Sequence, residues 1–333
     1  MPTELRPTRR ALITGGSSGL GLACARSLLQ DPGTQWSLLI ASRNAADGQR
    51  AADTLNREAG RSAVRYLPLD LGSLQAIHSF ADALLARGER LDALVLNAGL
   101  QFRDSEQRTA DGFEATFGTN HLGHFLLLHR LLPLLQAQAR VAVVSSGTHD
   151  AAQRTGMPVP RFVGAELLAH PEQDVQRQFA GADAPSVQGR RRYSTSKLCN
   201  VYFTYELDRR LRALPPGHAL AGVAVNAFDP GLMPGTGLAR AYPPALRWVW
   251  KNIMPVLRLL VRNANAPETS GAALAALVRG EPLPVSTGAY YEGRKPIRSS
   301  TPSYDTVAAR ALWEASARMV GVDASMAAMA AMR

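Results

Sequence analysis

The chain has only two cysteines among its 333 residues, Cys24 and Cys199. Two cysteines are too few for a disulfide framework or a cysteine-rich zinc module, so we expect free thiols in a reducing compartment. The first apolar run begins at Ala11, which leaves no room for the hydrophobic segment of a signal peptide. No uncharged apolar stretch reaches about 18 residues, so no membrane-spanning helix is expected. These absences favour a cytoplasmic location and argue against a bound metal.

Lysine is also scarce, because it occurs only at Lys197, Lys251 and Lys295 among 37 basic residues. With 27 acidic residues, the formal net charge is +10. A nucleic-acid-binding protein gathers such charges on one stripe or face. Here the arginines are scattered, apart from the run at 190–192, so we expect no nucleic-acid partner.

Apolar residues make up 46% of the chain, which is enough for a large core and excludes intrinsic disorder. Short apolar runs alternate with longer segments that carry apolar residues at helical spacing. The runs predict strands at about 11–14, 36–41, 64–69, 91–97, 141–145, 221–227 and 288–291. Helices are expected at about 19–30, 45–58, 73–87, 119–137, 193–212 and 267–279, with Ser73 as an N-cap. This order predicts an α/β fold, a doubly wound parallel sheet of about seven strands with helices on both faces.

Two segments interrupt the alternation. Residues 147–192 are polar and contain four prolines, which favours loops and short helices. Residues 231–266 are apolar and basic and have no partner strand. Neither segment has the composition of a linker, so we expect one domain over residues 1–333, with an insertion at about 147–192 and a substrate lid at about 231–266.

A glycine-rich turn separates the first strand from the first helix, and it reads Thr14-Gly15-Gly16-Ser17-Ser18-Gly19-Leu20-Gly21. Glycines let the backbone turn sharply and approach a pyrophosphate, which the helix N-terminus binds through its N–H groups. The same letters satisfy the nucleophile elbow of α/β-hydrolases, but only 14 residues precede Gly15, too few for the earlier strands of that fold. The turn therefore predicts a Rossmann-type dinucleotide site.

The end of the second strand bears on the choice of dinucleotide. A site for NAD(H) places a carboxylate there for the ribose hydroxyls, whereas an arginine accommodates the 2′-phosphate of NADP(H). This chain has Ser42 and Arg43 at that point and no carboxylate before Asp47. We therefore expect NADP(H) in preference to NAD(H), with a merely solvated Arg43 as the alternative.

Tyr193 and Lys197 stand four residues apart at the start of a predicted helix, so both side chains share one face. A neighbouring ammonium favours the phenolate and lowers the pKa of a tyrosine toward the range useful for acid–base catalysis. This pair follows the predicted cofactor-binding half of the chain, which suits it to proton transfer beside a nicotinamide.

From about residue 9 to at least 290, the chain resembles the short-chain dehydrogenase/reductase family. Its motifs occur in the family's order: Thr14–Gly21, Asp70, Asn97-Ala98-Gly99, Asn120, Ser146, Tyr193 with Lys197, and Asp229-Pro230-Gly231. The resemblance implies a hydride-transferring oxidoreductase that uses a nicotinamide cofactor.

The resemblance implies a catalytic tetrad of Asn120, Ser146, Tyr193 and Lys197. Tyr193 would exchange a proton with the carbonyl or alcohol oxygen, and Lys197 would bind the nicotinamide ribose and lower the tyrosine pKa. Ser146 would polarise the carbonyl, with Ser145 as the neighbouring alternative. Asn120 would hold a relay water, or it would be a buried amide that braces the sheet.

The expected cofactor contacts lie at several strand ends. They are Gly15, Ser17, Ser18, Gly19, Leu20, Gly21, Ser42, Arg43, Asp70, Leu71, Asn97, Ala98, Gly99, Tyr193, Lys197, Pro230 and Gly231. Asp70 would contact the adenine, and its alternative role is that of a carboxylate at a helix start.

Within the family, the closer likeness is to retinol dehydrogenases and light-dependent protochlorophyllide reductases. The phrases that carry it are Thr109–Glu114, Thr119–Phe125, Ser196–Asn200 and Thr236–Arg240, together with the long separation of Ser146 from Tyr193. The chain departs from the protochlorophyllide enzymes at Leu232, where they usually carry cysteine, and at Gly99, where they usually carry alanine. Light-dependent ring reduction is therefore the second expectation, and a non-catalytic NADP(H)-binding protein is the third. His121 and His124 lack a third metal ligand and are expected to pack in the core.

The apolar 231–266 segment follows the sixth strand, at the edge of the sheet where ligands bind in open α/β folds. It predicts a lid over a bulky hydrophobic carbonyl or alcohol, with Leu232, Met233 and Trp248 as substrate contacts. Four cations at 247, 251, 258 and 262 share a helical face beside two tryptophans, so peripheral membrane contact through 240–262 is the alternative. The sequence does not specify an oligomeric state.

Overall fold

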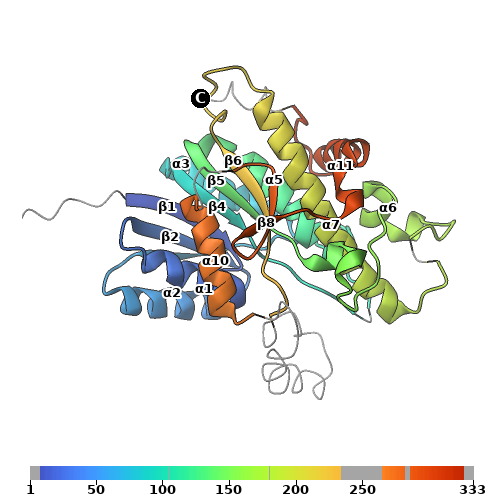
Figure 1. Cartoon of the computed structure of the whole chain (residues 1–333), viewed down its shortest axis with the longest axis horizontal. Helices are drawn as coiled ribbons and strands as arrows, with labels where there is room; N and C mark the ends of the chain where they lie inside the picture. The colour runs from blue at the N-terminus through green and yellow to red at the C-terminus, as the bar shows by residue number, and fades with distance from the viewer. Residues whose placement is uncertain (1–7, 104, 180, 234–264, 282–285, 326–333) are drawn as a thin grey trace, which may run out of the picture.

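The computed structural model describes residues 8–325 except 104, 180, 234–264 and 282–285. An eight-stranded sheet forms its centre, in the order β3-β2-β1-β4-β5-β6-β7-β8 (Figure 1). The strands are β1 Thr8–Thr14, β2 Gln35–Ser42, β3 Val64–Pro68, β4 Leu91–Leu96, β5 Leu135–Val144, β6 Ala224–Asp229, β7 Ala289–Glu292 and β8 Lys295–Ile297. The first seven are parallel, as predicted, and β8 adds an antiparallel edge strand.

Helices cover both faces of the sheet, which confirms the doubly wound α/β architecture. On one face lie α1 (Gly19–Leu29), α2 (Ala45–Ala59) and α10 (Pro267–Arg279). On the other lie α3 (Leu74–Arg87), α5 (Gly123–Leu131), α7 (Pro185–Arg212) and α11 (Thr306–Met319). Successive side chains of β1 point to opposite faces of the sheet. Ile13 therefore packs in the first layer, which contains α1, α2 and α10, and Leu12 packs in the second layer on the other face.

Local sequence signals account for several helix boundaries. The Ser73 side chain accepts a hydrogen bond from the Ala76 amide, which confirms the predicted N-cap of α3. Asn44 caps α2 in the same way through the Asp47 amide. Both helices end at a glycine in the left-handed conformation, Gly60 and Gly88, the usual terminator of a helix.

Two predicted helices have different bounds in the structure. The helix expected at 119–137 is wrong at its C-terminal end, because α5 stops at Leu131 and a short turn containing Pro133 leads directly into β5. Proline cannot supply the amide that would continue the helix. In contrast, α7 begins at Pro185 rather than at 193, so the end of the polar insertion is helical. Earlier, the insertion contains α6 (Ala165–Ala169) and short 3-10 turns.

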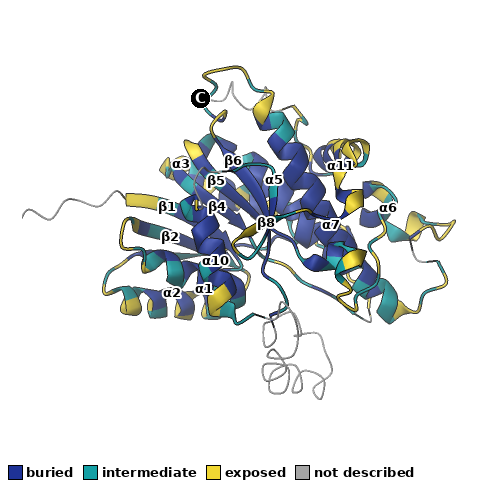
Figure 2. Cartoon of the chain, viewed as in Figure 1, coloured by how far each residue is buried: buried dark blue, intermediate teal, exposed yellow. Residues whose placement is uncertain are grey.

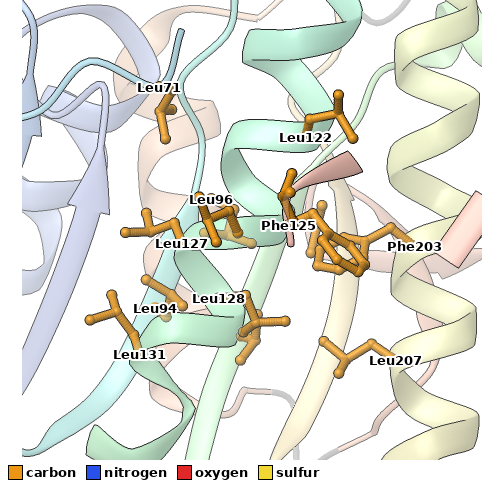
Figure 3. Packing of buried hydrophobic residues seen from close by; sticks show 14 of the residues in the cluster. Leu71, Leu94, Leu96, Leu122, Phe125, Leu127, Leu128, Leu131, Phe203 and Leu207 are labelled. Atoms are coloured by element: carbon orange, nitrogen blue, oxygen red, sulfur yellow. The ribbon is translucent and has the colours of Figure 1, made fainter. Parts of the chain in front are cut away.

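The helix α11, which the sequence pattern did not predict, closes the second layer by packing against α5 and α7. Trp313 of α11 meets the ring of Phe125 at a centroid distance of 4.9 Å and that of Phe203 at 5.8 Å. Phe125 and Phe203 also point toward one another across the two helices (Figure 3). This packing leaves α7 buried along much of its length (Figure 2).

Most of the expected lid lies outside the described residues, including Trp248 and the 240–262 segment proposed for membrane contact. Leu232 is half-buried, and Met233 is buried in the core layer that contains α1 and α10. Across the described part of the chain, no helix combines the length and apolar character needed to cross a membrane.

Candidate active site

The strand order brings distant motifs together at one edge of the sheet. The order reverses between β1 and β4, whose carboxyl ends carry the glycine-rich turn and the Asn97-Ala98-Gly99 segment. The adjacent β5 ends at Val144, immediately before Ser145 and Ser146. Such a switch point is where open α/β folds bind their ligands.

Close packing explains the glycines in the first turn. Gly15 has a φ of +67°, which favours glycine. A Cβ on Gly21 would lie 2.5 Å from the Gly15 carbonyl oxygen and 2.8 Å from Asn97 Nδ2. The first turn of α1 has no acidic residue, so its N-terminal amides offer an uncompensated positive dipole. This cradle fits the pyrophosphate of a dinucleotide.

Thr14 joins the glycine turn to the end of β4. Its hydroxyl oxygen accepts hydrogen bonds from the amides of Asn97 (2.8 Å) and Ala98 (3.0 Å), and Asn97 Nδ2 donates to the Thr14 carbonyl at 2.7 Å. His124 Nε2 lies 2.9 Å from the same hydroxyl, and His124 Nδ1 lies 3.2 Å from the Asn120 carbonyl. The glycine-rich turn is thereby tied to the helical segment that carries Asn120.

Asn120 lies in a π-helical turn, residues 118–122, between α4 (Ala115–Phe117) and α5. Such irregular turns are frequent at functional sites. Its side chain accepts from the Leu100 amide (2.8 Å) and donates to the Leu100 carbonyl (3.0 Å) and to Ser196 Oγ (3.0 Å). Asn120 therefore holds the loop after β4 against α7. Its place in the tetrad and the alternative that it braces the sheet both stay predictions.

Lys197 is buried and directed toward the ends of β4 and β5. Its Nζ donates to the Val144 carbonyl at 3.2 Å and lies 5.4 Å from the centroid of the Tyr193 ring. A Cβ on Gly99 would lie 3.6 Å from that Nζ, so the ammonium also borders the loop after β4. Burial lowers the pKa of Lys197 to about 8, while the negative charge of Asp229 opposes this shift.

The structure distinguishes the two candidate serines. Ser145 is fully buried, and its hydroxyl donates to the main-chain carbonyl of Lys197 at 2.8 Å. Ser146 is half-buried, and its Oγ accepts from the Thr148 amide at 3.3 Å, which leaves the hydroxyl proton uncommitted to that bond. This geometry favours Ser146 as the group available to a substrate.

The end of β2 combines an exposed cation with a buried hydroxyl. Arg43 is exposed, and among the described atoms the buried Ser42 Oγ has no hydrogen-bond partner. At the end of β3, Asp70 is half-buried and accepts from the Gly72 amide at 2.9 Å, while Leu71 is buried. These positions suit the adenosine end of a dinucleotide, because they follow β2, which neighbours β1, and β3, the next strand outward.

Asp229 supplies a buried carboxyl at the end of β6, beside the predicted Pro230-Gly231 contacts. Its Oδ1 accepts from the Gly231 amide at 2.8 Å, and its Oδ2 accepts from the Tyr290 hydroxyl at 3.0 Å. Burial raises the pKa of Asp229 to about 6. Tyr290 comes from β7, and no local sequence signal connects it with the site.

The predicted core histidines are buried and hydrogen-bonded. His121 Nε2 lies 2.9 Å from Ser316 Oγ of α11, and burial lowers the pKa of His121 to about 3 and that of His124 to about 4. Within the described ranges, no three His, Cys, Asp or Glu side chains group as a metal site. Both cysteines are buried free thiols.

Three comparisons with known proteins bear on the family and the fold. Residues 9–157 match the family model of the short chain dehydrogenases. Protochlorophyllide reductase A of rice is 32% identical over 325 residues, which cover 93% of this chain and 80% of the rice protein. Human retinol dehydrogenase 13 is 31% identical over 319 residues, covering 96% of this chain and 86% of the human protein. The crystal structure of an uncharacterised Mycobacterium paratuberculosis protein has a TM-score of 0.66 at 27% identity, covering 96% of this chain and 97% of its own.

The chain therefore belongs to the short-chain dehydrogenase/reductase family of nicotinamide-dependent oxidoreductases. Its relatives include protochlorophyllide reductases and a retinol dehydrogenase, the branch expected from the sequence.

Proposed function

We propose that this protein interconverts a bulky hydrophobic carbonyl compound and its alcohol with NADP(H). The observation that carries the proposal is the buried Lys197 ammonium, 5.4 Å from the Tyr193 ring centroid and beside the loop after β4. A cation held there stabilises negative charge on the tyrosine oxygen, which general acid–base catalysis requires.

Each member of the tetrad has a task in this proposal. Tyr193 donates its phenolic proton to the carbonyl oxygen during reduction, or takes it back during oxidation. Ser146 donates a hydrogen bond to the same oxygen. Lys197 donates one N–H to the Val144 carbonyl and binds the ribose hydroxyls with its remaining N–H groups. Asn120 fixes the loop after β4 against α7. The bound nicotinamide supplies or accepts the hydride.

The preference for NADP(H) rests on the end of β2. Arg43 is exposed where a 2′-phosphate would lie, and Ser42 has a buried hydroxyl that is unpartnered among the described atoms. Asn44 caps α2, so the N-terminus of this helix adds positive dipole at the same place. These features favour an additional phosphate over a bare ribose.

A carbonyl-substrate panel followed by NADPH oxidation tests the reaction class. Tyr193→Phe should abolish turnover of any accepted carbonyl and leave the Kd for NADPH within about threefold, because only the phenolic hydroxyl is lost. Tyr202→Phe, on the same helix as Tyr193 and outside the tetrad, controls for loss of a tyrosine hydroxyl. Turnover retained by the Tyr193 variant would refute the mechanism.

Reduction of a porphyrin ring double bond under light is the second candidate. The similarity to rice protochlorophyllide reductase extends over 93% of this chain, and this favours the candidate. Assays with a porphyrin substrate in darkness and under illumination separate the two, because carbonyl reduction needs no light. Turnover that depends on light would replace our first proposal.

The remaining proposals concern substrate contacts, location and partners. We propose that Leu232, Met233 and Trp248 contact the hydrophobic substrate. We also propose that the protein is cytoplasmic and touches membranes only peripherally, through 240–262. Flotation with liposomes tests the membrane contact, and recovery of all protein in the aqueous fraction would contradict it. Binding to nucleic acid is not proposed.

A further inference from the structure

His149 is a buried histidine that contacts the main chain of Ser146. Its ring Nδ1 lies 2.7 Å from the Ser146 carbonyl oxygen, and its main-chain amide donates to the same oxygen at 3.1 Å. On the other side of the ring, Nε2 lies 3.1 Å from the amide of Ser300, 151 residues further along the chain. The ring thus links the end of β5 to the segment before α11.

These two partners define the protonation state of the ring. A carbonyl oxygen can only accept, so Nδ1 carries the proton, and an amide can only donate, so Nε2 is the acceptor. The ring is therefore the neutral Nδ1–H tautomer. Burial lowers the pKa of His149, so the ring stays neutral at pH values at which an exposed histidine begins to gain a proton.

Tyr290 and Asp229 hold the ring from the neighbouring strands. The Tyr290 ring packs against the His149 imidazole with 4.8 Å between centroids, and its hydroxyl, 3.4 Å from Nδ1, donates to Asp229 Oδ2 at 3.0 Å. Asp229 faces Lys197 electrostatically and bonds the Gly231 amide. Asp150, which follows His149, is half-buried and also faces the ring electrostatically. The imidazole therefore has one fixed orientation.

We propose that His149 is a positioning residue for Ser146: its Nδ1–H fixes the Ser146 carbonyl and thereby the direction of the Ser146 hydroxyl. This inference rests on the proposed function, in which that hydroxyl bonds the substrate carbonyl. Ser146 has extended backbone angles at the start of a 3-10 turn, so the orientation of its peptide sets the direction of its Cα–Cβ bond, and the Thr148 amide holds its Oγ at 3.3 Å. Fixing that peptide excludes orientations in which the hydroxyl points away from the substrate.

Two near-isosteric variants separate the two hydrogen bonds of the ring. In His149→Asn, the amide NH₂ takes the place of Nδ1 and keeps the bond to Ser146. In His149→Gln, the amide oxygen takes the place of Nε2 and keeps the bond to Ser300. We expect kcat for carbonyl reduction within about threefold of wild type for H149N and about ten- to a hundredfold lower for H149Q, since small misplacements of reacting groups cost about this much. The Kd for NADPH should stay unchanged in both.

A lower kcat in H149N than in H149Q would overturn the proposal. Equal losses of kcat in both variants, together with a lower melting temperature, would assign His149 a merely structural role and overturn it as well. Unchanged kcat in H149Q would also overturn it. Should H149Q fail to fold, His149→Leu, similar in volume and without a donor, takes its place with the same expectation. Ser146→Ala and Y193F run in parallel: their retained turnover would refute the proposed function itself, whereas their loss with an active H149Q refutes only this inference.

Discussion

Asn97 donates a hydrogen bond from its side-chain amide to the main-chain carbonyl of Thr14, over 2.7 Å and across 83 residues of sequence. This bond joins the end of β4 to the start of the glycine-rich turn. Two strands that are neighbours in the sheet thus hold the two sides of the proposed pyrophosphate and nicotinamide site at a fixed spacing.

Asn97→Asp should weaken both the fold and cofactor binding. A carboxylate cannot donate to the Thr14 carbonyl and would face it as a second acceptor, at a cost of about 1–3 kcal/mol. We expect a lower melting temperature and a Kd for NADPH raised about tenfold in fluorescence titrations. Asn56→Asp is the control, because Asn56 makes a similar amide bond to the Val64 carbonyl far from the site. Equal NADPH affinities in the two variants would contradict the role of Asn97.

Gly21→Ala should impair NADPH binding, because the added methyl would lie 2.5 Å from the Gly15 carbonyl oxygen and force the turn apart. We expect at least a tenfold higher Kd. Gly33→Ala serves as control, since its Cβ would meet only Asp31 Oδ1, at 3.6 Å. Full affinity in the Gly21 variant would show that the turn does not contact the cofactor.

Arg43→Ala should reduce the preference for NADPH over NADH. An exposed arginine gains affinity from a 2′-phosphate and little from a ribose hydroxyl, so kcat/KM for NADPH should fall about tenfold or more and that for NADH should change little. Arg50→Ala removes another exposed arginine, paired with Asp47 on α2, and should alter neither value. Parallel losses for both cofactors would remove the role of Arg43 in discrimination.

The activity should decline above a pH near 8. The mechanism needs the charged form of Lys197, and because the pKa of this ammonium is lowered to about 8, the charge is present below that pH and lost above it. The negative charge of Asp229 raises this pKa. Asp229→Asn should therefore move the alkaline limb of kcat/KM to lower pH. A limb that stays in place in the variant would contradict the coupling of the two groups.

His129→Leu should make the fold less sensitive to acid. Burial lowers the pKa of His129 from 6.5 to about 4, so between those values the unfolded chain binds a proton that the folded chain does not. Folded-state stability from this group is thus present above pH 6.5 and lost as the pH falls, by about 1.4 kcal/mol per pH unit. Urea unfolding at pH 6 and pH 5 should show a smaller loss in the variant by about that amount. An equal loss in both proteins would contradict this account.

The sequence by itself determined the strand and helix alternation, the glycine turn and the cap at Ser73. These are local properties, because apolar periodicity, glycine conformation and side-chain capping act within a few residues. The motif order, read against a known family, also predicted the family and the four residues of the tetrad, whose catalytic roles stay predictions. The helix predicted to continue to residue 137 was wrong beyond Leu131, because the apolar periodicity runs on past Pro133 although the proline ends the helix.

Only the tertiary structure decided which side chains meet. Ser145 is buried and bonds the main-chain carbonyl of Lys197, which no local pattern indicates. The contact of His149 with Ser300 joins segments 151 residues apart. Likewise, α11 packs against helices that precede it in the chain, and β8 pairs with β7. The sequence of either element alone therefore does not predict its position. Long-range packing sets these relationships, because a hydrogen-bond partner or a pKa depends on what surrounds a group in space and not on its neighbours in sequence.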